Sequence, residues 1–196
     1  GIPIDSKFKK TYDSGLIKKE LGFNNVDPIV LVMGGNQGLG AIEKIIKSVL
    51  SDGKHAYQMI VITGTNTKLF KNLNNLVKKE KVSHIRVMSY VEDMYRVLEA
   101  VDLIVTKPGG MTTAEAMVKN IPMILVDPIP GQEKKNADFL VKKGAAIEVN
   151  SYMEVFPAIN TFFSENGCVD KMKQAIEKLA RPNSALDIAR LIDEVI

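Results

Sequence analysis

The sequence predicts an α/β fold, a Rossmann-like doubly wound parallel sheet of six strands followed by C-terminal helices. Short apolar runs recur along the chain, and segments with the apolar spacing of amphipathic helices separate them. The 196 residues, 45% hydrophobic and 25% charged, are ordinary for one soluble domain with a sizeable core. Because strand and helix alternate, the crossovers are expected to be right-handed and helices should cover both faces of the sheet.

The predicted elements follow one another regularly along the chain. The strands are the apolar runs at residues 29–33, 57–63, 84–88, 102–106, 122–126 and 145–149. The helices between them are predicted at 40–51, 67–80, 92–100, 112–119 and 133–142, and three more follow at 151–163, 168–179 and 183–195. Pro157 is expected to kink the first of these last three helices, and Pro182 separates the other two.

The first 28 residues differ from the rest of the chain. They hold one amphipathic stretch around Leu16, Ile17 and Leu21, and otherwise they are typical of a linker. We therefore predict a linker with a leading helix at 1–28 and a ligand-binding domain at 29–196. The first residue is Gly1 rather than Met, which indicates a processed or truncated fragment.

Composition and charge exclude several classes of function. The net charge is +3, and the lysine pairs are scattered, whereas a nucleic-acid site gathers its cations on one face. The alternative to plain solvated faces is a weak attraction to an anionic membrane surface. Cys168 is the only cysteine and His55 and His84 lie far apart, so no disulfide framework and no metal site are expected, and the compartment is reducing. No apolar run reaches the roughly 18–20 residues of a membrane span.

Two glycine-rich loops follow the first and fourth predicted strands, at Gly34–Gly40 and Lys107–Thr112. In the usual strand order 3-2-1-4-5-6, these strands are neighbours and their loops open onto one crevice. Each loop leads into a helix N-terminus with free N–H groups and a partial charge of about +0.5. We therefore predict a site for a phosphate-bearing ligand; the alternative for either loop alone is a tight turn.

The loops do not fit the common nucleotide fingerprints. Residues 34–40 read GGNQGLG, which lacks G-x-G-x-x-G, and no acidic residue follows the second strand to hold an adenosine ribose. Ala41 and Ile42 stand where a Walker motif requires Lys and Ser or Thr. A dinucleotide or ATP is therefore disfavoured, and the lack of an Asp-x-Asp pair gives no support for a metal clamp.

Two further motifs have both a structural and a functional interpretation. Gln132 and Glu133 follow the fifth strand and suit the vicinal hydroxyls of a sugar, but Glu133 is also where an acidic residue would complement a helix N-terminus. Thr112 and Glu115 fit a capping box, in which Thr112 is the N-cap. Because their loop faces the first glycine-rich turn, we expect both side chains to turn outward to a ligand instead.

Together these motifs resemble the donor half of a GT-B glycosyltransferase. The group comprises the bacterial processive diacylglycerol β-glucosyltransferases, the plant monogalactosyldiacylglycerol synthases and the lipid II GlcNAc transferase. The resemblance covers nearly the whole chain, and its most specific carriers are residues 106–116, TKPGGMTTAEA, and residues 130–137, PGQEKKNA. Residues 1–4, GIPI, match the interdomain linker of this group, but Asp5 stands where relatives commonly carry Arg.

The resemblance implies a site for a UDP-sugar. Glu115 would accept hydrogen bonds from the ribose, Val91 and Tyr90 would hold uracil, and Gln132 and Glu133 would hold the hexose. Gly109, Gly110, Met111 and Thr112 would bind the diphosphate from one side. Gly34, Gly35 and Asn36 would cover its other side, with Gly64 from the loop after the second strand. No metal and no cofactor are implied.

The resemblance also implies an activity, which is inverting transfer of a hexose, from UDP-glucose or UDP-galactose, to a lipid such as diacylglycerol. The general base and the lipid groove would belong to an N-terminal acceptor domain that this chain lacks, so the fragment alone should be inactive. The full-length protein would be cytoplasmic and peripherally membrane-associated, without nucleic-acid partners. Alternatives are a separate, non-catalytic UDP-sugar-binding subunit of a split glycosyltransferase, an enzyme like UDP-GlcNAc 2-epimerase and, more distantly, a nicotinamide dehydrogenase.

Overall fold

The computed structural model describes residues 1–35, 37–38, 40–52 and 56–195. Its centre is a six-stranded sheet in the order β3-β2-β1-β4-β5-β6, in which every neighbouring pair is parallel. The strands are β1 (Ile29–Met33), β2 (Gln58–Ile62), β3 (Ile85–Met88), β4 (Leu103–Thr106), β5 (Met123–Val126) and β6 (Ala146–Val149). The predicted fold class is confirmed, and each strand lies within one residue of its predicted bounds.

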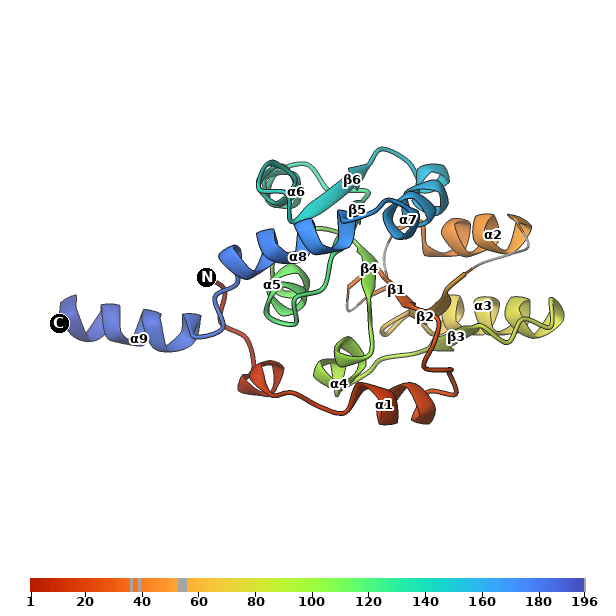
Figure 1. Ribbon diagram of the computed structural model, residues 1–196, viewed down its shortest axis with the longest axis horizontal. Helices are drawn as coiled ribbons and strands as arrows, with labels where there is room; N and C mark the ends of the chain where they lie inside the picture. The colour runs from red at the N-terminus through yellow and green to blue at the C-terminus, as the bar shows by residue number, and fades with distance from the viewer. Residues whose placement is uncertain (36, 39, 53–55, 196) are drawn as a thin grey trace.

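The helices of the sheet crossovers alternate with the strands. They are α2 (Ile42–Asp52), α3 (Thr67–Lys79), α4 (Met94–Glu99), α5 (Gly110–Val118) and α6 (Gln132–Lys142). Before β1 lie the 3-10 helix η1 (Ser6–Lys9) and α1 (Ser14–Glu20), and Figure 1 shows η1 and α1 beside α5 and α4, on the opposite side of the sheet from α2, α3 and α7. The helices therefore cover both faces of the sheet.

The chain ends in the 3-10 helix η2 (Tyr152–Glu154) and three helices, α7 (Val155–Ser164), α8 (Cys168–Leu179) and α9 (Ser184–Val195). The predicted helix at 151–163 is thus wrong at its start, because its first residues form η2 and α7 begins only at Val155. Pro157 falls in the first turn of α7, where a proline costs no helical hydrogen bond, so no kink is required of it.

The core is built on the strands. Every residue of β1, β2, β4 and β5 is buried, as expected for parallel strands that are covered on both faces. Helical residues such as Ile46, Leu73 and Ile176 complete the core. In contrast, α9 projects from the body of the molecule, and of its described residues only Ser184 is buried (Figure 1). The sheet thus forms a rigid platform, and the loops at its carboxyl edge are free to form a site.

Candidate functional site

A pocket of about 290 Å³ opens at the carboxyl ends of the strands, where the loops after β1, β2 and β3 meet the start of α5. Seven residues predicted from the sequence line it: Gly35, Gly64, Tyr90, Val91, Met111, Thr112 and Glu115. Five more residues of the lining were not predicted: Phe8, Met33, Ile62, Glu92 and Met94. The structure therefore brings the ends of β1, β2 and β3 with their loops, the first turns of α4 and α5, and Phe8 near the start of the chain into one pocket.

Four of the five unpredicted lining residues could have been found from the sequence, and the fifth, Phe8, could not. Met33 and Ile62 end β1 and β2, so a signal was available: the last residue of a strand borders the crevice at its carboxyl edge. Glu92 and Met94 directly follow the predicted pair at residues 90–91. No signal in the sequence indicated Phe8, because it lies in a segment of linker composition and is distant along the chain from both glycine-rich loops.

The remaining predicted residues lie outside the lining of this pocket. Gly34 is buried after β1, Gly109 is the N-cap of α5, and Gly110 is the first residue of that helix. Gln132 and Glu133 begin α6. Asn36 lies outside the described residues. The loops that carry these residues nevertheless border the same edge of the sheet.

The N-terminus of α5 is shaped to receive an anion. Its first intrahelical hydrogen bond runs from the Thr113 N–H to the Gly109 carbonyl oxygen at 3.0 Å. The N–H groups of Gly110, Met111 and Thr112 precede that bond and therefore lack a helical acceptor. Two of these residues, Met111 and Thr112, line the pocket. Oriented N–H groups at a helix N-terminus form an anion site with the helix dipole.

The capping-box interpretation of Thr112 and Glu115 is wrong for this structure. Because α5 begins at Gly110 with Gly109 as its N-cap, Thr112 is already inside the first turn and Glu115 lies in the second. The hydroxyl that bonds back to the start of the helix belongs to Thr113, which donates to the carbonyl oxygen of Gly109 or of Gly110. Thr112 and Glu115 are thus left facing the pocket.

The Glu115 side chain is half-buried, and its carboxylate has no hydrogen-bond or ion-pair partner among the residues that the structure describes. Burial raises the pKa of its carboxyl from 4.5 to about 7, and no positive group among the described residues offsets this cost. A half-buried carboxylate without a partner is unfavourable in the free protein, but it can accept two hydrogen bonds from vicinal hydroxyls.

Lys107, in the loop after β4, lies close both to the loop after β1 and to the start of α6. Its ammonium group lies 4.0 Å from Glu133 Oε2, and its Cε atom lies 3.3 Å from where a Cβ on Gly40 would stand. Asn136 donates from Nδ2 to the Pro108 carbonyl oxygen at 3.0 Å. The glycine-rich loops after β1 and β4 therefore meet, as the sequence predicted, and α6 holds the second of them in place.

Glu133 has partners within the chain, whereas Gln132 is exposed. The Glu133 carboxylate accepts a 2.8 Å hydrogen bond from the Ile129 N–H, which closes the loop between β5 and α6, and it faces Lys107. In the free protein Glu133 therefore has a structural role at the start of α6. Gln132 keeps its amide available to a ligand.

Neither a metal-binding cluster nor a membrane span occurs among the residues that the structure describes. Within the described part of the chain, no group of three or more His, Cys, Asp or Glu side chains has the arrangement of a metal site. None of the helices in those same residues is long and apolar enough to cross a membrane.

Residues 29–185 match the C-terminal domain of glycosyltransferase family 28. The chain belongs to this family. Among its relatives are the processive diacylglycerol beta-glucosyltransferases of Bacillus subtilis (strain 168), 33% identical over 186 residues, and of Bacillus pumilus (strain SAFR-032), 30% identical over 195 residues. These matches cover 94% and 99% of the chain but 48% and 50% of the relatives, so the chain spans about half their length.

Solved structures show that this family 28 domain has the fold of the C-terminal half of GT-B enzymes. MurG of Acinetobacter baumannii aligns with a TM-score of 0.74 at 20% identity, over 98% of this chain and 57% of that one. Anabaena Alr3699/HepE, solved in complex with UDP and glucose, aligns with a TM-score of 0.73 at 16% identity, over 98% and 54%. At these identities the likeness establishes the fold.

Proposed function

We propose that this domain binds the UDP-sugar donor of an inverting hexosyltransferase that builds a glycolipid. The observation that carries the proposal is the environment of Glu115. Its half-buried carboxylate has no partner among the described residues, and it faces a pocket beside the free N–H groups of α5. A ribose would supply the hydroxyl donors that Glu115 lacks. The diphosphate would lie at the N-terminus of α5, where its charge is favoured.

The loops around the pocket account for the remaining parts of such a ligand. Val91 and Tyr90 offer an apolar and an aromatic wall at the end of β3, suited to a flat base. The helix dipoles of α2 and α5 supply about one positive charge together. Lys107 begins the loop after β4, reaches toward Gly40 and is a further cation beside the site, although it also faces Glu133. Gln132 and Glu133 border the side of the crevice where the hexose would extend, and a sugar hydroxyl would compete with the Ile129 N–H for Glu133.

The chemistry assigned to this half is stabilisation of the leaving group. As the bond between the anomeric carbon and UDP breaks, negative charge grows on the diphosphate, and fixed N–H groups meet it without rearrangement. An inverting transfer also requires a base that takes the proton of the acceptor hydroxyl. We place that base, and the groove for a lipid acceptor such as diacylglycerol, in the half of the relatives that this chain does not span.

The exposed face of α9, the last helix, supports the proposal that the base and the acceptor groove lie in another domain. Ile188, Leu191, Ile192 and Val195 are exposed on α9, and at helical spacing they share one face. The Ser184 hydroxyl, at the first residue of α9, donates to the Ile2 carbonyl oxygen at 2.7 Å, so residue 1 lies at the base of this helix. We propose that a preceding acceptor domain covers the apolar face of α9, and that the complete enzyme works as a peripheral protein at the cytoplasmic face of a membrane.

Calorimetry tests donor binding directly. We expect heat from UDP and from at least one of UDP-glucose, UDP-galactose and UDP-GlcNAc, and none from NAD, because no acidic side chain follows β2 to grip an adenosine ribose. Heat with NAD alone would refute the proposal. Transfer assays on the 196-residue chain should give no glycolipid; robust transfer would show that the base lies in this half.

A further inference from the structure

The first 13 residues run along the helices that build the pocket. The Ile2 side chain lies 2.7 Å from where a Cβ on Gly110 would stand, directly at the start of α5. Further along, η1 packs on α5, and the aromatic rings of Tyr12 and Tyr95 are 5.2 Å apart between their centroids. We call residues 1–13 the N-terminal segment. It has the composition of a linker but contacts the domain along its length.

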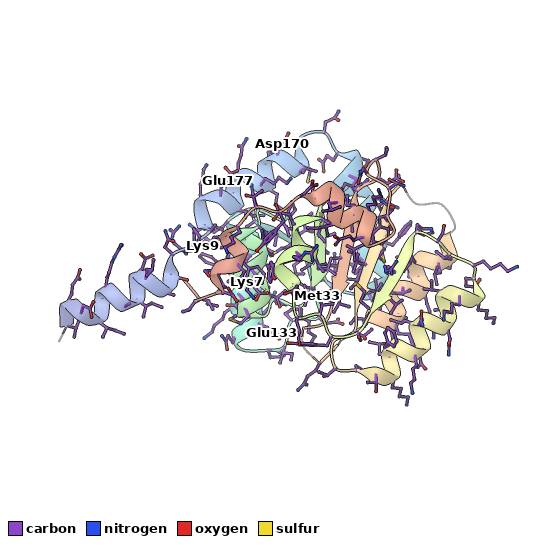
Figure 2. All side chains as sticks on the ribbon, turned by 90° about the horizontal axis from the view of Figure 1, so that it is seen from below. Lys7, Lys9, Met33, Glu133, Asp170 and Glu177 are labelled. Carbon is purple, nitrogen blue, oxygen red and sulfur yellow. The ribbon has the colours of Figure 1, made fainter. Side chains whose placement is uncertain are left out.

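Phe8 is the residue of this segment that reaches the pocket. It is 6% exposed and lines the pocket together with Met94, Met111 and Glu115. Its ring meets Tyr95 of α4 edge-on, with 6.1 Å between the ring centroids. Figure 2 shows η1, which carries the labelled Lys7 and Lys9, near the end of β1, where Met33 is labelled. Phe8 therefore closes the pocket on the side where α4 and α5 meet.

The turn that presents Phe8 is fixed by Asp5. The Asp5 carboxylate accepts a 2.8 Å hydrogen bond from the Lys7 N–H and caps η1. This contact gives Asp5 a role at the start of η1, and the role needs a hydrogen-bond acceptor rather than a cation. Asp5 does not itself line the pocket, so its effect on a ligand passes through the position of Phe8.

A second anchor follows Phe8 in the sequence. Lys119, near the end of α5, donates to the Lys10 carbonyl oxygen at 2.6 Å and lies over the Tyr12 ring, 5.1 Å from its centroid. Lys119 is also paired with Glu99 of α4, and both side chains are largely buried. Phe8 is thus held from both sides, by a capped turn before it and by a buried ion pair after it.

We propose that Phe8 is a specificity-determining wall of the nucleoside pocket, and that Asp5 is the residue that positions it. The inference rests on the proposed function, because it assumes that a nucleotide occupies the pocket. A uracil ring has two apolar faces and is smaller than a purine. With Phe8 in place the pocket has about 290 Å³, and removal of the ring would enlarge it on the side where α4 and α5 meet.

Calorimetry with UDP and ADP on four variants tests this assignment. Phe8→Ala should weaken UDP binding about tenfold or more, the scale on which single aromatic contacts to a base act, and should narrow the preference for UDP over ADP. Phe23→Leu is the matched control, because Phe23 is 8% exposed in the same N-terminal region but does not line the pocket; it should preserve the preference. Asp5→Ala should weaken UDP binding, whereas Asp5→Asn, which retains an acceptor oxygen, should restore it.

Each result bears on one proposal. If the unaltered protein binds no UDP, the proposed function fails. If it binds UDP but Phe8→Ala binds equally well, or loses UDP and ADP in parallel with the ratio unchanged, Phe8 serves only the fold and the inference is overturned. Equal loss in Asp5→Ala and Asp5→Asn would overturn the positioning role of the Asp5 cap. Melting curves of all four variants show whether each is folded at the temperature of titration.

Discussion

Glu115 is a single side chain whose charged form is made unfavourable by burial. The folded-state pKa of about 7 lies above the ordinary 4.5, so the folded chain binds this proton more tightly than the unfolded chain. The free energy of unfolding should therefore fall as pH rises from about 4.5 through 7, which is opposite to the usual carboxylate. Ligand hydroxyls would favour the charged form and offset the burial.

Glu115→Gln separates this role from a structural one. We expect strong loss of UDP-sugar binding, because a neutral amide cannot replace a carboxylate that accepts two hydrogen bonds. The free energy of unfolding should not fall, and above pH 7 it should rise slightly as the burial cost disappears. Chemical denaturation at pH 5 and pH 8, with calorimetry, measures both. Glu177→Gln on α8 is the control; a stability loss with UDP binding intact would contradict the ligand role.

The pH dependence of UDP binding provides an independent test. Because the carboxyl of free Glu115 has a pKa of about 7, affinity should increase as pH rises from 6 to 8 and then level off. Binding near pH 6.5 should release a proton, which titrations in buffers of different ionisation enthalpy detect. Affinity that falls over this range would refute a charged Glu115 in the complex.

At the scale of elements, the site depends on how closely the loops approach one another. Gly38 has a φ of +57°, and a Cβ there would overlap the Thr63 carbonyl oxygen at the end of β2. Asn136 on α6 holds the loop after β4 through the Pro108 carbonyl oxygen. Each loop is thus placed by a neighbouring element, and the shape of the pocket is a property of the loops together.

Gly38→Ala should therefore harm both stability and binding. The left-handed backbone alone costs a non-glycine residue about 1–2 kcal/mol, and overpacking against a carbonyl adds about 1–3 kcal/mol. Gly167→Ala is the matched control, because Gly167 also has a positive φ, +77°, but open space around it and no place in the pocket. Thermal or urea unfolding should show the larger loss in Gly38→Ala, and UDP titration should show loss in that variant alone. Equal losses of stability in the two variants would mean that backbone strain, and not the overlap with the Thr63 carbonyl oxygen, causes the effect of Gly38→Ala.

At the scale of the whole molecule, α9 is a helix with one buried residue, Ser184, among those that the structure describes. Ile192 is 51% exposed on α9, whereas Ile176 is 0% exposed on the neighbouring α8. Ile192→Ser should change the free energy of unfolding by no more than about 0.5 kcal/mol, and Ile176→Ser should cost about 3–5 kcal/mol. Urea denaturation measures the difference. A large fall in the free energy of unfolding for Ile192→Ser would show that α9 packs on this domain. That result would contradict the proposal that a preceding acceptor domain covers the apolar face of α9.

The sequence by itself determined the sheet. Parallel strands that are buried on both faces are continuous apolar runs, so residues 29–33 and 122–126 could be predicted as strands without a structure. The strand order was expected from the usual order of a doubly wound sheet, 3-2-1-4-5-6, and that order placed the two glycine-rich loops together. The positions of Gly35, Met111, Thr112 and Glu115 followed in this way from the loops at the carboxyl edge, whereas Gly64, Tyr90 and Val91 were expected only from the family resemblance.

Only the tertiary structure decided the details that depend on contacts distant in sequence. The start of α5 at Gly110, rather than at Thr112, turned a plausible capping box into two side chains that face the pocket, because local capping signals do not say which of several turns the packing selects. Phe8 reached the pocket through contacts with α4 and α5, which lie more than 80 residues away in the chain. The position of this segment depends on contacts with α4 and α5, both apolar and hydrogen-bonded, and a short segment without helical or strand periodicity gives no local signal of such contacts.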